Sequence, residues 1–294
     1  MKRLIVNADD LGADASRDAG IFEAIRAGVV TSASILANGP SLGNSLRKIL
    51  SLPPDKISWG IHLNLSEGTP LTEGLRRLCG KDGRFLGKAP AHELLSRRGD
   101  AELEKEIALE MEAQISSLQN SGILLSHLDG HQHAHVFPAV IRAAVGAAEF
   151  HKIPWMRIPE EPDPSPGEEG VSGLSMAEAR NFSRLAREAR IHLQGTEILT
   201  TDHFLGLYLK GRLTPGILKE ILRRIPPGLT ELMVHPGRVP SPPAAGAFSS
   251  FSTPEREKEL EALLDAGFRL FLRENGVEMT PFPKTGECPP SCAS

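Results

Sequence analysis

Short apolar runs alternate with amphipathic segments along most of the 294-residue chain. The apolar runs predict strands over 3–8, 31–36, 57–65, 123–130, 155–159, 231–235 and 268–272. Helical spacing of apolar residues predicts helices over 15–27, 42–50, 100–119, 138–150, 175–190, 214–225 and 254–266. The clearest of these is 100–119, where Leu103, Ile107, Met111 and Ile115 recur every four residues. The stretches 66–99 and 159–173 are less regular, and we expect the first to form a loop or lid and the second a loop.

Strands that alternate with helices at this spacing favour right-handed βαβ units around a parallel sheet. Roughly seven strands, most of them followed by a helix, predict an α/β fold of the TIM-barrel kind, a distorted (β/α) barrel. A doubly wound open sheet is the alternative. Because no internal repeat or clean linker divides the chain, we expect residues 1–274 to form one catalytic barrel domain and 275–294 a C-terminal tail.

Composition and charge narrow the class of protein. The net charge of −4 and the pI near 6.2 give no basic field, which argues against nucleic acid as a partner. No segment approaches the ~20 apolar residues of a membrane span, and the apolar part of MKRLIVNADD is too short for a signal peptide. We therefore expect a cytoplasmic protein. The three cysteines do not suggest a disulfide framework, and Cys288 and Cys292 fall in the predicted tail.

Polar side chains cluster where the predicted strands end, which is the face where α/β barrels place their sites. Asp9 and Asp10 directly follow the first strand. Two adjacent carboxylates there are costly unless a cation or hydrogen-bond donors offset them, although a helix N-cap is the ordinary alternative. His62 lies in the strand GIHLNL, and Asn64 beside it extends a polar stripe that is unusual on a core strand.

The segment SHLDGHQHAHVFP concentrates imidazoles after another strand. Neutral imidazole is the commonest protein ligand of transition metals. If the segment is helical, His131 and His135 share a face, and if it is extended, His133 shares that face with both. The spacing does not decide which histidine binds a metal. A capping cluster or adventitious metal affinity is the alternative to a functional site.

One carboxylate with two imidazoles leaves positions for water and substrate, which is the usual form of a hydrolytic metal centre. The remaining carboxylate can then act as base. Arg157, at the end of a short strand, is placed to orient that base by a two-pronged hydrogen bond, with a surface salt bridge as the alternative. His235 is a candidate acid for a leaving amine. Asp202 and His203, between two predicted helices, are candidate substrate contacts together with Asn64.

Four separated motifs carry a resemblance to a known family: NADDLG, GIHLNLSEG followed by TPL, HLDGHQHAHVFP and ELMVHPG. They occur in the order seen in the YdjC-like (ChbG-type) carbohydrate deacetylases, and the chain resembles that family from residue 3 to about 272. RIPEEP and the overall length are closer to members associated with hopanoid lipid biosynthesis. Two features depart from the family: Leu11 stands where many members carry Phe, and the second-half substrate region of typical chitooligosaccharide members is not matched.

The family is similar to the wider polysaccharide-deacetylase superfamily, which has a distorted (β/α) barrel, an Asp–His–His metal site and a neighbouring Asp base. By position in the motifs, the resemblance implies that the metal ligands are Asp10, His62 and His131. It further implies that Asp9 is the general base, that Arg157 orients it and that His235 is the acid. The implied reaction removes the N-acetyl group from an N-acetylated amino sugar, as an oligosaccharide or a lipid-linked glycoside.

The expected cofactor is one divalent metal ion, Mg or Zn, with Co or Mn as alternatives. The expected partner is an N-acetylated sugar, and a homodimer is one option for the oligomeric state. Two other functions are considered. A metal-dependent phosphoesterase predicts two metals and more ligating carboxylates, whereas a non-catalytic sugar-binding protein predicts loss of the base or of a ligand. The sequence lacks neither the base nor a ligand.

Overall fold

The computed structural model describes residues 1–53, 56–164, 173–209, 211–243 and 245–284. Within these residues, one sheet of parallel strands has the order β5-β4-β3-β2-β1-β7-β6, and β8 pairs with the beginning of β1. The strands are β1 (Lys2–Leu11), β2 (Ser32–Ile35), β3 (Ser58–Leu63), β4 (Leu125–Gly130), β5 (Trp155–Met156), β6 (His203–Leu205), β7 (Gly228–Val234) and β8 (Val277–Met279).

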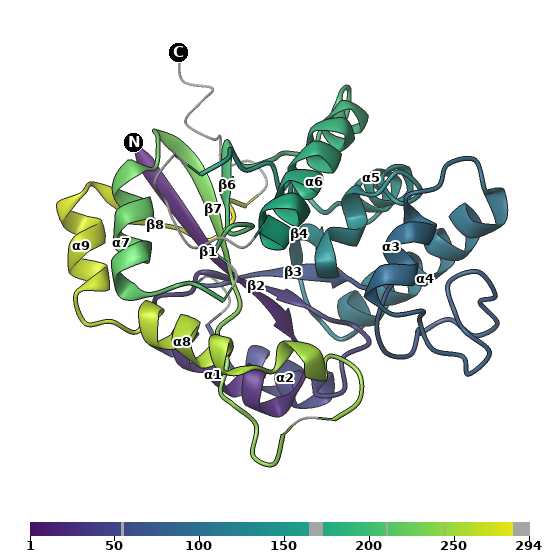
Figure 1. Ribbon diagram of the computed structural model, residues 1–294, viewed down its shortest axis with the longest axis horizontal. Coiled ribbons are helices and arrows are strands. Elements are labelled where there is room, and N and C mark those ends of the chain that lie inside the picture. The colour runs from purple at the N-terminus through teal and green to yellow at the C-terminus, as the bar shows by residue number, and fades with distance from the viewer. Residues whose placement is uncertain (54–55, 165–172, 210, 244, 285–294) are drawn as a thin grey trace.

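Helices surround this sheet, as Figure 1 shows. In chain order they are α1 (Ala15–Arg26), α2 (Leu42–Ile49), α3 (Lys88–Leu95), α4 (Ala101–Asn120), α5 (Ile141–Phe150), α6 (Gly173–Ala189), α7 (Pro215–Arg224), α8 (Pro254–Leu263) and α9 (Phe268–Glu274). The four-residue apolar period of α4 is buried throughout, and the carboxylate of Asp100 caps its first turn. None of the described helices is long and apolar enough to cross a bilayer.

The two edges of the sheet meet through a short irregular segment. A parallel bridge joins Trp155 of β5 to Leu199, and the backbone N–H of Asp202 donates to the carbonyl of Leu229 in β7 at 2.9 Å. The chain from Leu199 into β6 therefore lies between β5 and β7. This arrangement confirms the predicted distorted (β/α) barrel.

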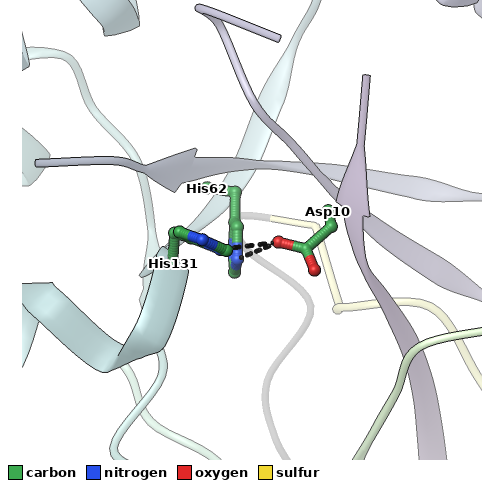
Figure 2. Close-up of side chains that lie close together, drawn as sticks. All are labelled: Asp10, His62 and His131. Carbon is green, nitrogen blue, oxygen red and sulfur yellow. Dashed lines mark hydrogen bonds and ion pairs between the residues drawn. The ribbon is translucent and has the colours of Figure 1, made fainter. Parts of the chain in front are cut away.

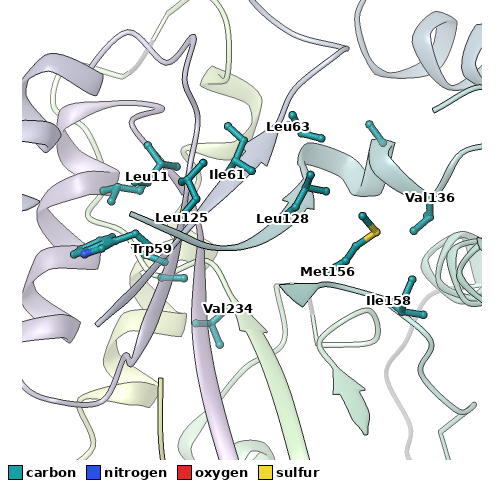
Figure 3. Close-up of a cluster of buried hydrophobic side chains, with 14 of the residues drawn as sticks. Leu11, Trp59, Ile61, Leu63, Leu125, Leu128, Val136, Met156, Ile158 and Val234 are labelled. Carbon is teal, nitrogen blue, oxygen red and sulfur yellow. The ribbon is translucent and has the colours of Figure 1, made fainter. Parts of the chain in front are cut away.

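Alternate side chains of β1 separate two regions of the interior. Leu4, Val6 and Ala8 belong to the main core, part of which Figure 3 shows. Ile5, on the opposite side of the strand, belongs to a separate apolar cluster with Trp155, Leu229 and Phe282. Because strand side chains alternate, Ile5, Asn7 and Asp9 face the inside of the barrel. Leu11, which follows an irregularity in the pairing with β2, lies in the main core. The inside of the barrel is apolar at the start of the strands and becomes polar toward their carboxyl ends.

The prediction of a final strand over 268–272 is wrong, because these residues belong to α9. Phe268, Phe271 and Leu272 follow the helical spacing i, i+3, i+4, and both Phe268 and Leu272 are buried. Five residues are too few for the spacing of apolar positions alone to distinguish a strand from a helix. The segment 66–99, expected to be irregular, contains the short helix α3.

The chain beyond residue 274 contributes to the barrel. β8 pairs with β1, and the side chain of Phe282 is buried in the apolar cluster inside the barrel. The indole Nε1–H of Trp155 donates to the carbonyl of Pro283 at 2.9 Å. The part of the expected tail that the structure describes therefore closes one end of the barrel. Cys79 is a buried free thiol, whereas Cys288 and Cys292 lie outside the described residues.

Candidate active site

The carboxyl ends of the parallel strands bring six of the predicted site residues to one cavity. Asp9 and Asp10 lie just before the last residue of β1, His62 lies just before the last residue of β3, and His131 follows β4. Together with His235 after β7, they line a cavity of about 110 Å³. The sixth residue, Arg157, lies behind them, where it contacts Asp9.

Asp10 is the common partner of two imidazoles (Figure 2). Its Oδ1 lies 2.7 Å from Nδ1 of His131 and 3.2 Å from Nε2 of His62. Its Oδ2 accepts a hydrogen bond from the buried guanidinium of Arg17 at 2.9 Å. The backbone of Asp10 is left-handed, with φ of 66°, which Asp tolerates better than most residues. One carboxylate oxygen is therefore turned toward the two imidazoles and the other is held by Arg17.

His62 is oriented from behind by Asp129. The Nδ1–H of His62 donates to Oδ1 of Asp129 at 2.7 Å, so that Nε2 is the atom turned toward Asp10. A carboxylate behind a histidine is the usual arrangement around a metal ligand, because it fixes the tautomer and the ring plane. The sequence placed Asp129 at a strand end but gave it no role. The signal lay in the register of β3 and β4, which pairs these two residues directly.

The donor set fits one divalent cation. One ligand atom each of Asp10, His62 and His131 lies within 4.8 Å of the others. The Nε2 of His62 and Oδ1 of Asp10 are both acceptors when the imidazole is neutral, and a cation between them removes their mutual repulsion. Burial lowers the pKa of His62, but the carboxylates of Asp129 and Asp9 outweigh it and raise that pKa to about 10. The surroundings therefore favour positive charge at this point.

Asp9 is held by a two-pronged hydrogen bond. Both Nη atoms of Arg157 donate to its carboxylate oxygens, each at 2.7 Å. Burial raises the pKa of Asp9 above its ordinary value, against the lowering effect of Arg157. A buried carboxylate with a raised pKa and fixed oxygens suits a general base.

Arg157 also limits the number of cations that the site can hold. Asp9, His62 and Asp129 form a second group with metal-ligand spacing. The guanidinium of Arg157 lies between the two carboxylates of this group. Its Nη2 lies 2.9 Å from Oδ2 of Asp129 and also donates a hydrogen bond to Oδ1 of Asp9. It also pairs with the buried carboxylate of Glu231 at 2.7 Å. This second position is therefore already neutralised by an arginine.

The HQHAH segment is neither a regular helix nor a strand. It forms a 3-10 turn in which Gln132 and His133 have left-handed backbones, with φ of 53° and 56°. His131 reaches Asp10, whereas Nε2 of His135 lies 2.9 Å from the carbonyl of Arg157 and anchors that strand end. His133 lines the cavity and packs edge-on against Phe182. The left-handed residues explain why spacing arguments did not separate the three histidines.

His235 lies at the cavity edge with its side chain 15% exposed. Its backbone N–H donates to the buried carboxylate of Glu259 at 2.6 Å, which fixes the chain where β7 ends. Its Nδ1 lies 4.0 Å from Oε2 of the same Glu259, and the side chain lines the cavity.

The three predicted substrate contacts lie elsewhere. The side-chain oxygen of Asn64 accepts from the backbone of Ser66 and Glu67, so that it shapes a turn rather than the cavity wall. Asp202 and His203 bind the beginning of β7, through the N–H of Leu229 at 2.7 Å and the carbonyl of Pro227 at 3.1 Å. Asp202 precedes β6 and His203 is its first residue, which places both at the opposite end of the sheet from Asp10, His62 and His131.

Other residues complete the outer wall of the cavity. Lys88 at the start of α3 and Glu178 in α6 form an ion pair, and both line the cavity with Gln132, Tyr208 and Arg212. Lys88, Tyr208 and Arg212 come from segments without a recognisable period or motif. Gln132 and Glu178 lie in a motif and in a predicted helix, but neither pattern indicates which side chains face the cavity. No single-sequence signal marks these positions.

Comparisons with known proteins show the family and the fold of this chain. Residues 3–274 match the family model described as YdjC-like protein. The chain is 36% identical over 301 residues to a carbohydrate deacetylase of Mus musculus, with 94% of this chain and 93% of that protein covered. It is 29% identical over 284 residues to a carbohydrate deacetylase of Thermoanaerobacter pseudethanolicus, with coverage of 96% and 98%. A solved structure from Enterococcus faecalis is named for cellobiose-phosphate cleavage, and it is 22% identical to this chain with a TM-score of 0.72. The match covers 96% of this chain and 97% of that one, and it shows the same fold.

Proposed function

This chain belongs to the YdjC-like family, and we propose that it is a carbohydrate deacetylase that hydrolyses the acetamide of an N-acetylated amino sugar with one divalent cation. The observation that carries the proposal is the convergence of Asp10, His62 and His131 on one point, with a fixed carboxylate beside them. Zn²⁺ and Mg²⁺ both suit such a set, and Co²⁺ or Mn²⁺ are the alternatives.

When bound, the cation would polarise the acetamide carbonyl and activate water for attack. Asp9, held by Arg157, accepts the proton of the attacking water. His235, which also lines the cavity, donates a proton to the nitrogen as the C–N bond breaks. The products are acetate and the free amino sugar, and the base and acid are then reset by one proton exchanged with solvent.

The size of the cavity supports an acetyl group as the part of the substrate that enters. A volume of about 110 Å³ is well below the roughly 300–1,000 Å³ of pockets that enclose whole ligands. The sugar would then lie at the mouth, beside Lys88 and Glu178. Oligosaccharides and lipid-linked glycosides both remain candidates for the group beyond it.

The alternatives considered from the sequence have less support. A two-metal phosphoesterase needs a second cation position, but Arg157 already bridges the carboxylates there. A non-catalytic sugar-binding protein would be expected to have lost the base or a ligand, and Asp9 and the triad are all in place.

Acetate release tests this proposal. Purified protein with added Zn²⁺ or Mg²⁺ is assayed on N-acetylated mono-, di- and lipid-linked sugars. We expect Asp9→Asn to reduce kcat by about 10²–10⁴-fold, because the base is lost, while one metal ion stays bound. Asp202→Asn is the matched control, since this aspartate lies at the opposite end of the sheet. Full activity in Asp9→Asn would refute the role of the base, and no acetate from any sugar would refute the reaction.

A further inference from the structure

A layer of buried polar side chains lies directly beneath the candidate active site. It consists of Asn7 on β1, Ser34 on β2 and His127 on β4, and we call these three residues the polar layer. Each is 0% exposed, and none of them lines the cavity. Buried polar groups are costly unless they are hydrogen-bonded, so the hydrogen-bond partners of these three residues indicate what each residue does.

The hydrogen bonds of Ser34 have a forced direction. Its Oγ lies 2.6 Å from Oδ2 of Asp129, which as a carboxylate can only accept. The single hydroxyl proton of Ser34 therefore points to Asp129. The oxygen of Ser34 then accepts from Nδ2 of Asn7 at 2.8 Å and from Nε2 of His127 at 3.1 Å. This hydroxyl fixes the oxygen of Asp129 opposite the one that binds His62.

Asn7 connects the same hydroxyl to the base. Its Nδ2 donates to Oδ1 of Asp9 at 2.8 Å as well as to Ser34. The carboxylate of Asp9 is thus held by Arg157 and by Asn7 together. One amide group therefore links the base on β1 to the neighbouring strand.

His127 fills the remaining space. Its ring stacks on Phe282 at a centroid distance of 4.2 Å. It also occupies the volume beside Gly60, where an added Cβ would lie 2.2 Å from Nε2 of His127. Packing on both sides keeps this ring, and the hydrogen bond to Ser34, in one orientation.

We propose that the polar layer is a positioning device for the catalytic centre. Ser34 holds Asp129 so that His62 presents Nε2 to the cation. Asn7 holds Asp9 in the orientation required of the base. The two residues therefore act on different steps, Ser34 on metal affinity and Asn7 on turnover, and neither touches the substrate.

The first experiment compares Ser34→Ala with Ser32→Ala. Ser32 is the matched control, because it is also 0% exposed on β2 but its hydroxyl bonds to the carbonyl of Ser58 at 3.3 Å. Zinc affinity of the folded proteins is measured by competition with a chelating dye. We expect Ser34→Ala to bind zinc about 10–100-fold more weakly than the wild type, as other residues behind metal ligands do. Ser32→Ala should match the wild type.

The second experiment uses Asn7→Leu, which removes the amide at nearly constant volume. We expect kcat for acetate release to fall about 10-fold or more, with KM and zinc affinity within about two-fold of the wild type. This split separates positioning of the base from general loss of structure. It also tests the polar layer if Ser34→Ala fails to fold.

The role of the polar layer rests on the proposed metal site, but different results would contradict the layer and the metal site. A wild-type protein that binds no zinc contradicts the metal site itself. Unchanged zinc affinity in Ser34→Ala, or equal weakening in Ser32→Ala, overturns the role of Ser34. Unchanged kcat in Asn7→Leu, or loss of zinc binding there, overturns the role of Asn7.

Discussion

Gly60 shows how closely single residues beneath the site are packed. Its position on β3 faces the ring of His127, and atoms of that ring lie 2.2–2.5 Å from the point where a Cβ would be built. The ring cannot move away freely, since Phe282 stacks on its other side. The absence of a side chain at residue 60 is therefore a condition for the polar layer.

We expect Gly60→Ala to lower the free energy of unfolding by about 1–3 kcal/mol, the range for overpacked cores. His127→Ala should lower it too, because it leaves a cavity beside Phe282. In the double variant the methyl group of residue 60 occupies the space that the ring of residue 127 leaves. The double variant should therefore lose less free energy of unfolding than the sum of the losses of the two single variants. Urea unfolding of the four proteins measures this coupling, and strict additivity would show that the contact is unimportant.

Most residues at the centre of the candidate active site could be predicted one by one, because the carboxyl ends of parallel strands meet on one face of the barrel. That argument located Asp9, Asp10 and His62 from the sequence alone. It could not choose among the histidines of HQHAH, since two left-handed residues break both regular periods. Asp202 was a candidate only because it lies between two predicted helices, and no pattern in the sequence shows that the short strand β6 begins directly after it.

Most elements of the barrel followed from their periods, and the exceptions are α3, β6 and the elements near the C-terminus. The run FRLFL carries both a strand-like composition and a helical spacing, and burial of Phe268 and Leu272 on one face makes it helix. The following segment has few apolar residues, yet it supplies β8 and the buried Phe282. Its role depends on the shape of the barrel interior, which no local pattern of the sequence describes.

We expect Phe282→Ala to lower the free energy of unfolding by about 3–5 kcal/mol, because it removes a buried aromatic ring from a packed cluster. Phe150→Ala is the matched control: this ring is 76% exposed, and its loss should change stability by less than about 0.5 kcal/mol. Chemical denaturation of both variants checks the pair. Equal small effects would mean that the C-terminal segment does not close the barrel.

At the scale of the whole molecule, buried histidines make stability depend on pH. Burial lowers the pKa of His127 to about 3 and that of His135 to about 4, whereas the unfolded chain keeps a value of about 6.5. The stability they contribute is full above pH about 6.5 and is lost as the pH falls toward these folded values. His62 has the opposite sign, since its pKa of about 10 gives stability that is lost as the pH rises from about 6.5 to 10.

We therefore expect the chelated protein to be most stable near pH 6.5 and to lose about 2 kcal/mol for each of His127 and His135 at pH 5. Urea unfolding at pH 5, 6.5 and 9 in the presence of EDTA measures the profile. In His135→Gln, the loss of free energy of unfolding at pH 5 should be smaller by about 2 kcal/mol, the part that His135 contributes. A profile that is identical in this variant would contradict the assignment of a neutral buried His135.

We propose a deacetylase centre with one cation, and a titration of activity with metal checks how many ions the reaction needs. Protein stripped with EDTA and freed of chelator receives Zn²⁺ in steps while acetate release from an N-acetylated sugar is measured. We expect no activity at zero metal, a linear rise, and a plateau at one ion per chain, because Arg157 fills the second position. Activity that survives stripping, or that rises only with a second equivalent, would contradict it.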